Sequence, residues 1–279
     1  MTELPQCKTL LLVRDGGWLT IWFNQPETRN ALSSELTDEL RAVLQQLRSS
    51  REIRGITLRG KGGYFCAGGD LKAFKSNFQG GSQSLADVEQ ASIEAGALFD
   101  LVNEMPQVVV ILVEGAAMAG GLGMVCTADV VAVTREARFA MTETTLGIPP
   151  AQIAPFVAER LGLATARRLM LTAARFNGEQ AGQLGLADFV VDDAAGLDQV
   201  EADIRAQVGR CAANANAVTK EIVLATRSLP REQMIGLAAK GFAECMMSDE
   251  GREGVASFLE KRKPVWFDQF LPEDGQSAD

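Results

Sequence analysis

The pattern of apolar and polar residues predicts alternating strands and helices over the first two thirds of the chain. Short apolar runs, rich in β-branched residues, predict buried strands at 19–24, 53–59, 108–113 and 130–134. Apolar residues at helical spacing predict helices at about 34–48 and 85–103, and Ser33 or Ser34 is expected to cap the first. Strands that alternate with helices are typical of an α/β fold with right-handed crossovers.

The pattern changes at about residue 198, after which only helical spacing is visible. Helices are expected at 198–213, 214–227, 230–246 and 249–262. Ser248 is a suitable N-cap for the last helix, and Pro264 ends it. The sequence therefore predicts an α/β core over residues 1–197 and a helical region over residues 198–279.

One stretch, residues 108–129, stands out in the predicted core. A β-branched run is followed by a Gly/Ala-rich turn at 115–121 and then by the apolar start of a helix. Small residues let a ligand approach the backbone, and a helix start offers unpaired N–H groups. An anion, or an oxygen that gains negative charge during a reaction, would suit such a turn. The alternative is that these glycines only pack the helix against the strand.

A second glycine-rich turn, around Gly69, follows the short apolar segment 64–67. If the fold brings this turn to Gly120, two backbone N–H groups could donate to one carbonyl oxygen. Such an oxyanion hole is effective because loss of one donor typically costs about 3–4 kcal/mol of barrier. Neither turn matches the G-x-G-x-x-G dinucleotide fingerprint, and the phosphate-binding G-x-x-x-x-G-K-[ST] motif is absent from the sequence.

Composition narrows the classes of function. The 279 residues include 27 basic and 36 acidic side chains, and the net charge of −9 argues against nucleic acid or an anionic membrane as a partner. No signal peptide is visible, and Glu114 with the neighbouring glycines argues against a membrane span at 108–129. The 5 cysteines are scattered without a C-x-x-C pair, which predicts no disulfide framework, no zinc site and a cytoplasmic location.

The chain contains no histidine, which restricts its chemistry further. A Ser-His or Cys-His nucleophile and a histidine metal site are both excluded. Proton transfer near neutral pH must therefore use a carboxylate, lysine, tyrosine, cysteine or water.

Four motifs together carry a resemblance to a known family. They are FCAGGDL at 65–71, EGAAMAGGLG at 114–123, WLTIWFNQPETRNAL at 18–32 and SDEGREGVASFLEKRKP at 248–264. These motifs are spread over nearly the whole chain, and with them the sequence resembles the crotonase (enoyl-CoA hydratase/isomerase) family. The resemblance implies a spiral of β-β-α repeats with a C-terminal helical region that forms a homotrimer or a dimer of trimers. It also implies an acyl-CoA substrate and no cofactor other than the coenzyme A carried by that substrate.

Matched residue by residue, the resemblance places the two oxyanion donors on the N–H groups of Gly69 and Gly120. The resemblance also implies the acid/base groups, since typical hydratases of the family use two glutamates. Here Gly123 stands where the first is expected, and Glu143 stands at the second position. Partial burial of Glu143 would raise its pKa and suit an acid/base role, whereas the alternative reading is a solvated loop residue.

The same matching suggests residues for substrate binding. Arg29 is placed to meet the phosphates of coenzyme A, and Lys261 resembles a residue that contacts the nucleotide from a neighbouring subunit. The remaining expected contacts are Ala31, Ala67, Asp70, Leu71 and Phe258. Glu114 and Asp129, the other acids near the core, are expected to have structural roles.

One carboxylate leaves more than one reaction open. Hydration of an α,β-unsaturated acyl-CoA is favoured, because the chain is similar to the branch of the family acting on branched glutaconyl-CoA esters, such as methylglutaconyl-CoA or isohexenylglutaconyl-CoA. Δ3,Δ2 double-bond isomerisation by one glutamate is the alternative. Hydrolytic dehalogenation is set aside because residues 149–152 offer no aspartate nucleophile. A non-catalytic binding protein of this fold ranks lower, and the negative charge argues against RNA.

Overall fold

A computed structural model describes residues 4–70 and 84–268 of the chain. Its main sheet has six strands in the order β1-β2-β3-β4-β6-β9. Strands β1 and β2 form an antiparallel hairpin, and every later neighbour is parallel. The bounds are Leu10–Asp15 for β1, Trp18–Phe23 for β2, Gly55–Gly60 for β3, Val108–Val113 for β4, Val130–Thr134 for β6 and Phe189–Val191 for β9.

A second, three-stranded sheet lies beyond the main sheet and has the order β5-β7-β8. The bounds are Ala116–Met118 for β5, Arg138–Ala140 for β7 and Arg175–Asn177 for β8. β5 and β7 are parallel, whereas β8 returns antiparallel to β7. Because each of these strands has three residues, none shows a hydrophobic period, and the sequence pattern does not predict a second sheet.

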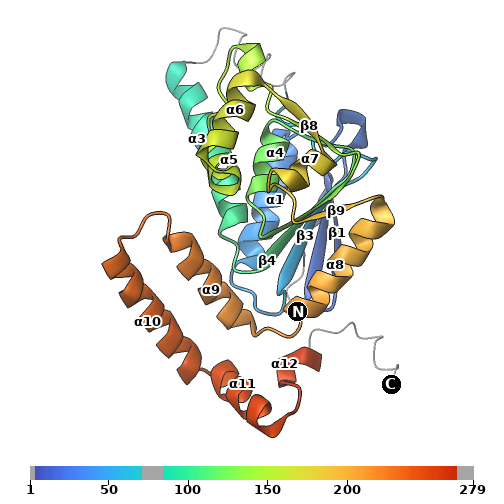
Figure 1. Ribbon diagram of the computed structural model, residues 1–279. Coiled ribbons are helices and arrows are strands. Elements are labelled where there is room, and N and C mark those ends of the chain that lie inside the picture. The colour runs from blue at the N-terminus through green and yellow to red at the C-terminus, as the bar shows by residue number, and fades with distance from the viewer. Residues whose placement is uncertain (1–3, 71–83, 269–279) are drawn as a thin grey trace.

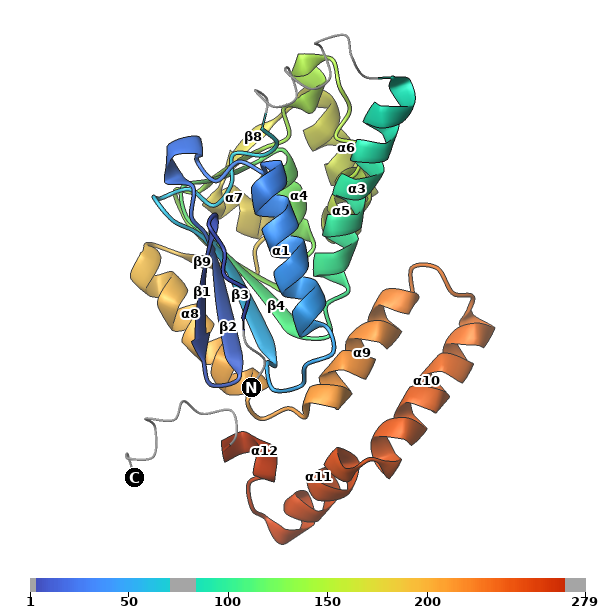
Figure 2. The same ribbon diagram turned by 180° about the vertical axis from the view of Figure 1, so that it is seen from behind.

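Helices cover both faces of the main sheet (Figures 1 and 2). The larger core lies under α1 (Ser34–Leu47), α3 (Leu85–Asn103) and α4 (Gly120–Cys126), and α8 (Ala194–Val208) packs on the opposite face. β4 serves both layers because its side chains alternate, with Ile111 in the larger core and Leu112 under α8. The other helices of this part are α5 (Ala154–Leu161), α6 (Leu163–Thr172), α7 (Gly178–Gln183) and the 3-10 helices η1 (Pro26–Thr28) and η2 (Glu143–Leu146).

Under α8, the Trp18 ring occupies the space that a side chain at Gly55 would need. Trp18 is fully buried, pairs with Gly55 across β2 and β3, and donates from Nε1 to Thr57 Oγ1 at 2.8 Å. A Cβ at Gly55 would overlap the ring. Gly55→Ala is therefore expected to destabilise the protein by about 1–3 kcal/mol, measured by urea denaturation. Gly236→Ala, where a Cβ meets nothing within 4 Å, serves as the control and should not destabilise.

The C-terminal helices extend away from the sheet (Figures 1 and 2). They are α9 (Ala213–Ala225), α10 (Arg231–Met247), α11 (Asp249–Glu260) and α12 (Val265–Asp268). Lys220 of α9 is tied to the core through Asp129 and the Gln107 carbonyl oxygen. Large apolar side chains of α10 and α11 remain exposed in the single chain, including Ile235 at 66%, Phe242 at 68% and Phe258 at 82%.

The α/β class expected from the sequence is confirmed, with a sheet followed by C-terminal helices. The predicted strand at 108–113 and helix at 85–103 have the expected bounds, and Ser33 caps α1 by accepting from Leu36 N–H. The first helix of the C-terminal series begins earlier than expected, at Ala194 rather than 198. Within the residues described, no helix is long and apolar enough to cross a membrane.

Candidate active site

The turn after β5 presents the N–H of Gly120. Ala119 joins β5 to α4 with φ 49° and ψ −121°, a left-handed conformation that is unusual for a residue with a Cβ. Its N–H donates to the Ala140 carbonyl oxygen at 2.8 Å, which ties the turn to the end of β7. Gly120 is the first residue of α4, so its N–H has no acceptor within the helix.

The turn around Gly69 packs directly on the first one. Cys66 forms a parallel bridge with Ala117, and Met118 N–H donates to the Cys66 carbonyl oxygen at 3.0 Å. Gly68 has φ +90°, and a Cβ there would meet Ala119 Cβ and the Met118 carbonyl oxygen, both at 2.8 Å. Only glycine allows this close approach of the two backbones.

The two predicted donors therefore lie close together. A Cβ at Gly120 would lie 4.0 Å from Gly69 N, next to Leu32 Cδ1 and Phe99 Cζ. Among the described residues, neither Gly69 N–H nor Gly120 N–H donates to another group. Two unpaired amides this close to each other could both donate to a developing oxyanion.

Glu143 follows β7, directly beside the Gly120 turn. β7 runs parallel to β5, with Met118 opposite Ala140, so Gly120 and Glu143 both lie just beyond the carboxyl ends of neighbouring strands. The Cys66–Ala117 bridge adds the Gly69 segment to the same edge. The register thus places three segments side by side, about 4.8 Å apart from one to the next. Cys66, Ala117 and Phe139 are paired side by side, and Gly69, Gly120 and Glu143 lie three, three and four residues after them, respectively.

The Glu143 carboxyl group is half-buried, and its Oε2 atom is buried without a hydrogen-bond partner in the described part of the chain. Burial raises the pKa of this carboxyl group above its usual value, and a hydrogen bond from its own backbone N–H partly opposes that rise. A carboxyl group that is poorly solvated and has one oxygen without a hydrogen-bond partner can exchange a proton with a bound molecule. The solvated-loop reading of Glu143 is therefore wrong.

The raised pKa predicts how Glu143 affects stability. In the unfolded chain Glu143 ionises as pH rises through about 4.3, whereas in the native state it keeps its proton to a higher pH. Because the native state then binds more protons than the unfolded state, the protein loses stability as pH rises, until the higher native pKa is passed. We therefore expect the melting temperature of Glu143→Gln minus that of wild type to increase as pH rises from about 4 to 8. Melting curves on both sides of the isoelectric point, about 4.8, measure the difference. A difference that stays constant over this range would contradict the burial of the carboxylate.

Several expected substrate contacts lie around the Gly69 turn. The Arg29 carbonyl oxygen accepts from Ala67 N–H at 3.0 Å, and the exposed Arg29 guanidinium lies over the Tyr64 ring, 5.3 Å from its centroid. Ala31 is buried, and Asp70 is half-buried beside Gly69. Leu71, also expected here, lies outside the described residues. The structure therefore gathers Arg29, Ala31, Ala67 and Asp70 close to the predicted donors.

Phe258 and Lys261 are not brought to this site within one chain. Phe258 lies on α11, and Lys261 caps its C-terminus in the left-handed conformation, with φ 55°. Both views show α11 apart from α4 (Figures 1 and 2). Within one chain, these two residues therefore lie away from the Gly69 and Gly120 turns.

Two acids expected to be structural are engaged in ion pairs. Asp129 accepts from Val109 N–H at 2.7 Å and pairs with Lys220. Glu114 lies 3.6 Å from the Arg59 guanidinium. Both carboxylates therefore have basic partners, whereas Glu143 Oε2 has no hydrogen-bond partner in the described part of the chain.

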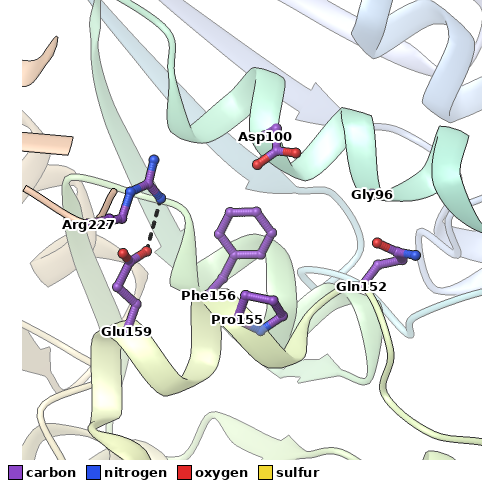
Figure 3. Close-up of a pocket in the computed structure, with 7 residues that line it drawn as sticks. All are labelled: Gly96, Asp100, Gln152, Pro155, Phe156, Glu159 and Arg227. Carbon is purple, nitrogen blue, oxygen red and sulfur yellow. Dashed lines mark hydrogen bonds and ion pairs between the residues drawn. The ribbon is translucent and has the colours of Figure 1, made fainter. Parts of the chain in front are cut away.

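A cavity of about 310 Å³ lies between α3 and α5. Figure 3 shows Gly96 and Asp100 on one side, α5 residues on the other, and Arg227 paired with Glu159 at 3.0 Å. Phe156 of the cavity wall packs on Phe99, with ring centroids 6.1 Å apart, and Phe99 reaches Gly120. None of the residues predicted from sequence lines this cavity.

Sequence reasoning missed the apolar groups that surround the donors. Leu32, Phe99 and Ile153 all approach glycines of α4. Leu32 belongs to the conspicuous RNAL segment, which was a usable signal, but Phe99 and Ile153 look like ordinary core residues. The part of the chain that is described holds no cluster of three or more potential metal ligands.

Comparisons with known proteins agree with this geometry. The family model for enoyl-CoA hydratase/isomerase matches residues 14–269. Pseudomonas aeruginosa AtuE is 45% identical with a TM-score of 0.90, and the match covers 93% of this chain and all of that one. An enoyl-CoA hydratase/isomerase from Marinobacter aquaeolei is 36% identical with a TM-score of 0.90, over 94% of this chain and all of that one.

A putative enoyl-CoA hydratase of Thermus thermophilus is 29% identical over 255 residues, which are 91% of this chain and 99% of that protein. These relatives indicate an enzyme of the hydratase type and go against a non-catalytic binding protein. The match of the family model over nearly the whole chain confirms the resemblance seen in the motifs. The chain belongs to the enoyl-CoA hydratase/isomerase family.

Proposed function

We propose that this chain hydrates the α,β double bond of an enoyl-CoA thioester. The N–H groups of Gly69 and Gly120 hold the thioester oxygen, and Glu143 is the single acid/base. The register of Cys66, Ala117 and Phe139 carries the proposal, because it brings the three segments to one edge. The free amides and the unpartnered Glu143 oxygen support it.

In the proposed reaction, the Glu143 carboxylate takes a proton from water while the hydroxyl oxygen bonds to the β-carbon. The electrons of the double bond move onto the thioester oxygen, where the two amides stabilise the enolate. Glu143 then returns its proton to the α-carbon, which gives a 3-hydroxyacyl-CoA and restores the carboxylate. A raised pKa suits a group that must both accept and donate a proton.

The proposed substrate class is a branched glutaconyl-CoA ester, such as isohexenylglutaconyl-CoA. The motifs AMAGGLG and TETTLGIPPAQIAP, which surround Gly120 and Glu143, support this choice by resemblance. The cavity between α3 and α5 supports a branched or extended acyl group, because Phe156 in its wall packs on Phe99, whose ring approaches Gly120.

The test is a substrate panel with purified protein, using a straight 2-enoyl-CoA, a straight 3-enoyl-CoA, methylglutaconyl-CoA and isohexenylglutaconyl-CoA. We expect addition of water to the 2-enoyl thioesters, with the highest kcat/KM for a branched glutaconyl ester. Preference for the straight 2-enoyl thioester would overturn the substrate class. Absence of hydration on the whole panel would overturn the proposed reaction.

One observation favours Δ3,Δ2-enoyl-CoA isomerisation as the second candidate. Gly123 supplies no second carboxylate to hold water. Glu143 alone would take a proton from C2 of a 3-enoyl-CoA and deliver it to C4, which moves the double bond to C2–C3. Faster conversion of the straight 3-enoyl-CoA than hydration of any 2-enoyl-CoA would establish this candidate instead.

The exposed apolar side chains of α10 and α11 support a homotrimer or a dimer of trimers as the working assembly. In such an assembly Phe258 and Lys261 would reach the coenzyme A bound by a neighbouring subunit, while Arg29 meets its phosphates. Light scattering coupled to gel filtration measures the assembly, and a monomer at micromolar concentration would contradict it. The 5 cysteines are all free thiols, which supports a cytoplasmic location.

A further inference from the structure

Ile153 and Gly123 interlock beside the candidate active site. A Cβ at Gly123 would overlap Ile153 Cγ2 and would lie 2.5 Å from Ile153 Cβ. Ile153 is buried, with 4% of its surface exposed, at the start of α5. Because Ile153 is branched at Cβ, its contact atoms are stiff and cannot swing aside as the end of a long side chain would. Residue 123 must therefore stay glycine while Ile153 is present.

The contact between Gly123 and Ile153 bears on catalysis because it lies close to Gly120. Gly123 follows Gly120 by three residues in α4, so the two share a face of the helix. Side chains on a helix point back toward its N-terminus. A side chain at 123 would therefore extend toward Gly120 and the space in front of Gly69 N–H, and Ile153 fills the first part of that path.

The polar neighbour of Ile153 is directed elsewhere. Gln152 Nε2 donates to Ser92 Oγ of α3 at 3.0 Å, and Gln152 lines the cavity in Figure 3. Ile153 therefore places hydrocarbon, without a polar group of its own, on the side of the site next to Gly123. Glu143 approaches the Gly120 turn along β7, from a different element.

We propose that Ile153 is a specificity-determining residue that restricts proton transfer to Glu143. By filling the space over Gly123, it excludes a second acid and a second water from the reacting carbons. The balance between addition of water and migration of the double bond is then set by the volume of this one side chain. The inference rests on the proposed function, since it concerns the same oxyanion hole and the same glutamate.

The test compares the ratio of hydration to double-bond migration in wild type and Ile153→Ala, using straight 2-enoyl-CoA and 3-enoyl-CoA. Ile153→Ala is expected to raise this ratio roughly tenfold, the scale of effect that one or two methylene groups have in a pocket. Val157→Ala, a loss of two methyl groups one turn later in α5, is the matched control and should leave the ratio unchanged. Ile153→Val gives an intermediate ratio and covers the case in which the alanine variant is unstable.

A second arm restores a carboxylate at residue 123. Gly123→Glu alone should lose its folded state, whereas Gly123→Glu combined with Ile153→Ala should fold and hydrate faster than Ile153→Ala does. This rescue of the melting temperature tests the interlock without any substrate, because the two positions must couple if they share space.

The outcomes separate the inference from the function on which it rests. A ratio within about twofold of wild type in Ile153→Ala, or failure of the double variant to regain its fold, would overturn the role of Ile153. Wild type that acts on neither thioester, while the rescue of the fold succeeds, would overturn the proposed function instead.

Discussion

Glu143→Gln is expected to lower kcat for hydration by about 10²–10⁴-fold with little change in KM. The substitution keeps the shape of the side chain but removes the group that carries the proton. Glu143 touches the reacting water and the α-carbon in the proposed mechanism, and it has no other partner for Oε2 in the described structure. Steady-state kinetics with the preferred 2-enoyl-CoA measure the effect.

The pH profile sharpens this prediction. Wild-type activity should fall at acidic pH as the Glu143 carboxylate becomes protonated, and burial places this fall above the pH at which an ordinary glutamate titrates. The fall should be absent from the residual activity of Glu143→Gln. Glu136→Gln, at an exposed turn before β7, is the matched control and should behave as wild type. Glu143→Gln that retains more than about a third of wild-type kcat would rule out the acid/base role.

Gly120→Val is expected to reduce kcat by about 10²–10³-fold, which corresponds to the loss of one oxyanion donor. A Cβ at this position would lie 4.0 Å from Gly69 N and 3.1 Å from Leu32 Cδ1, so the two further methyl groups of valine enter the space between the amides. The thioester oxygen then reaches one amide at most. Kinetic constants for hydration, compared with melting temperature, show whether the loss is catalytic.

Two controls accompany the valine variant. Gly120→Ala adds only the Cβ, which the flexible end of Leu32 can accommodate, so a smaller loss is expected. Gly236→Val introduces the same change in α10, where a Cβ meets nothing within 4 Å, and should retain wild-type kcat. Full activity in Gly120→Val would show that the thioester oxygen lies elsewhere.

The candidate site was predictable from sequence to the extent that it depends on residue type. Gly69 and Gly120 follow apolar segments, and the N–H of Gly120 lacks an acceptor within α4 because Gly120 opens that helix. Without histidine, a carboxylate was one of several remaining acid/base groups, and the family resemblance selected Glu143. The partial burial of Glu143 and the orphaned Oε2 depend on η2 and its packing on α6, which no local pattern shows.

Other parts of the site could not be predicted because they depend on contacts between distant segments. Ile153 reads as an ordinary apolar residue, and only the approach of α5 to α4 shows why residue 123 is glycine. Phe258 on α11 and Lys261 at its C-terminus lie away from the Gly120 turn, a placement that only the fold shows.

By itself, the sequence determined the α/β class, the long helices α1 and α3, the buried strand β4 and the residue types of the site. These features follow from hydrophobic period, capping and composition, which act over a few residues. The tertiary structure decided that the Gly69, Gly120 and Glu143 segments lie side by side, through the short second sheet and the Cys66–Ala117 bridge. Three-residue strands have no period to detect and are held only by their neighbours, so their pairing exists only in the folded chain.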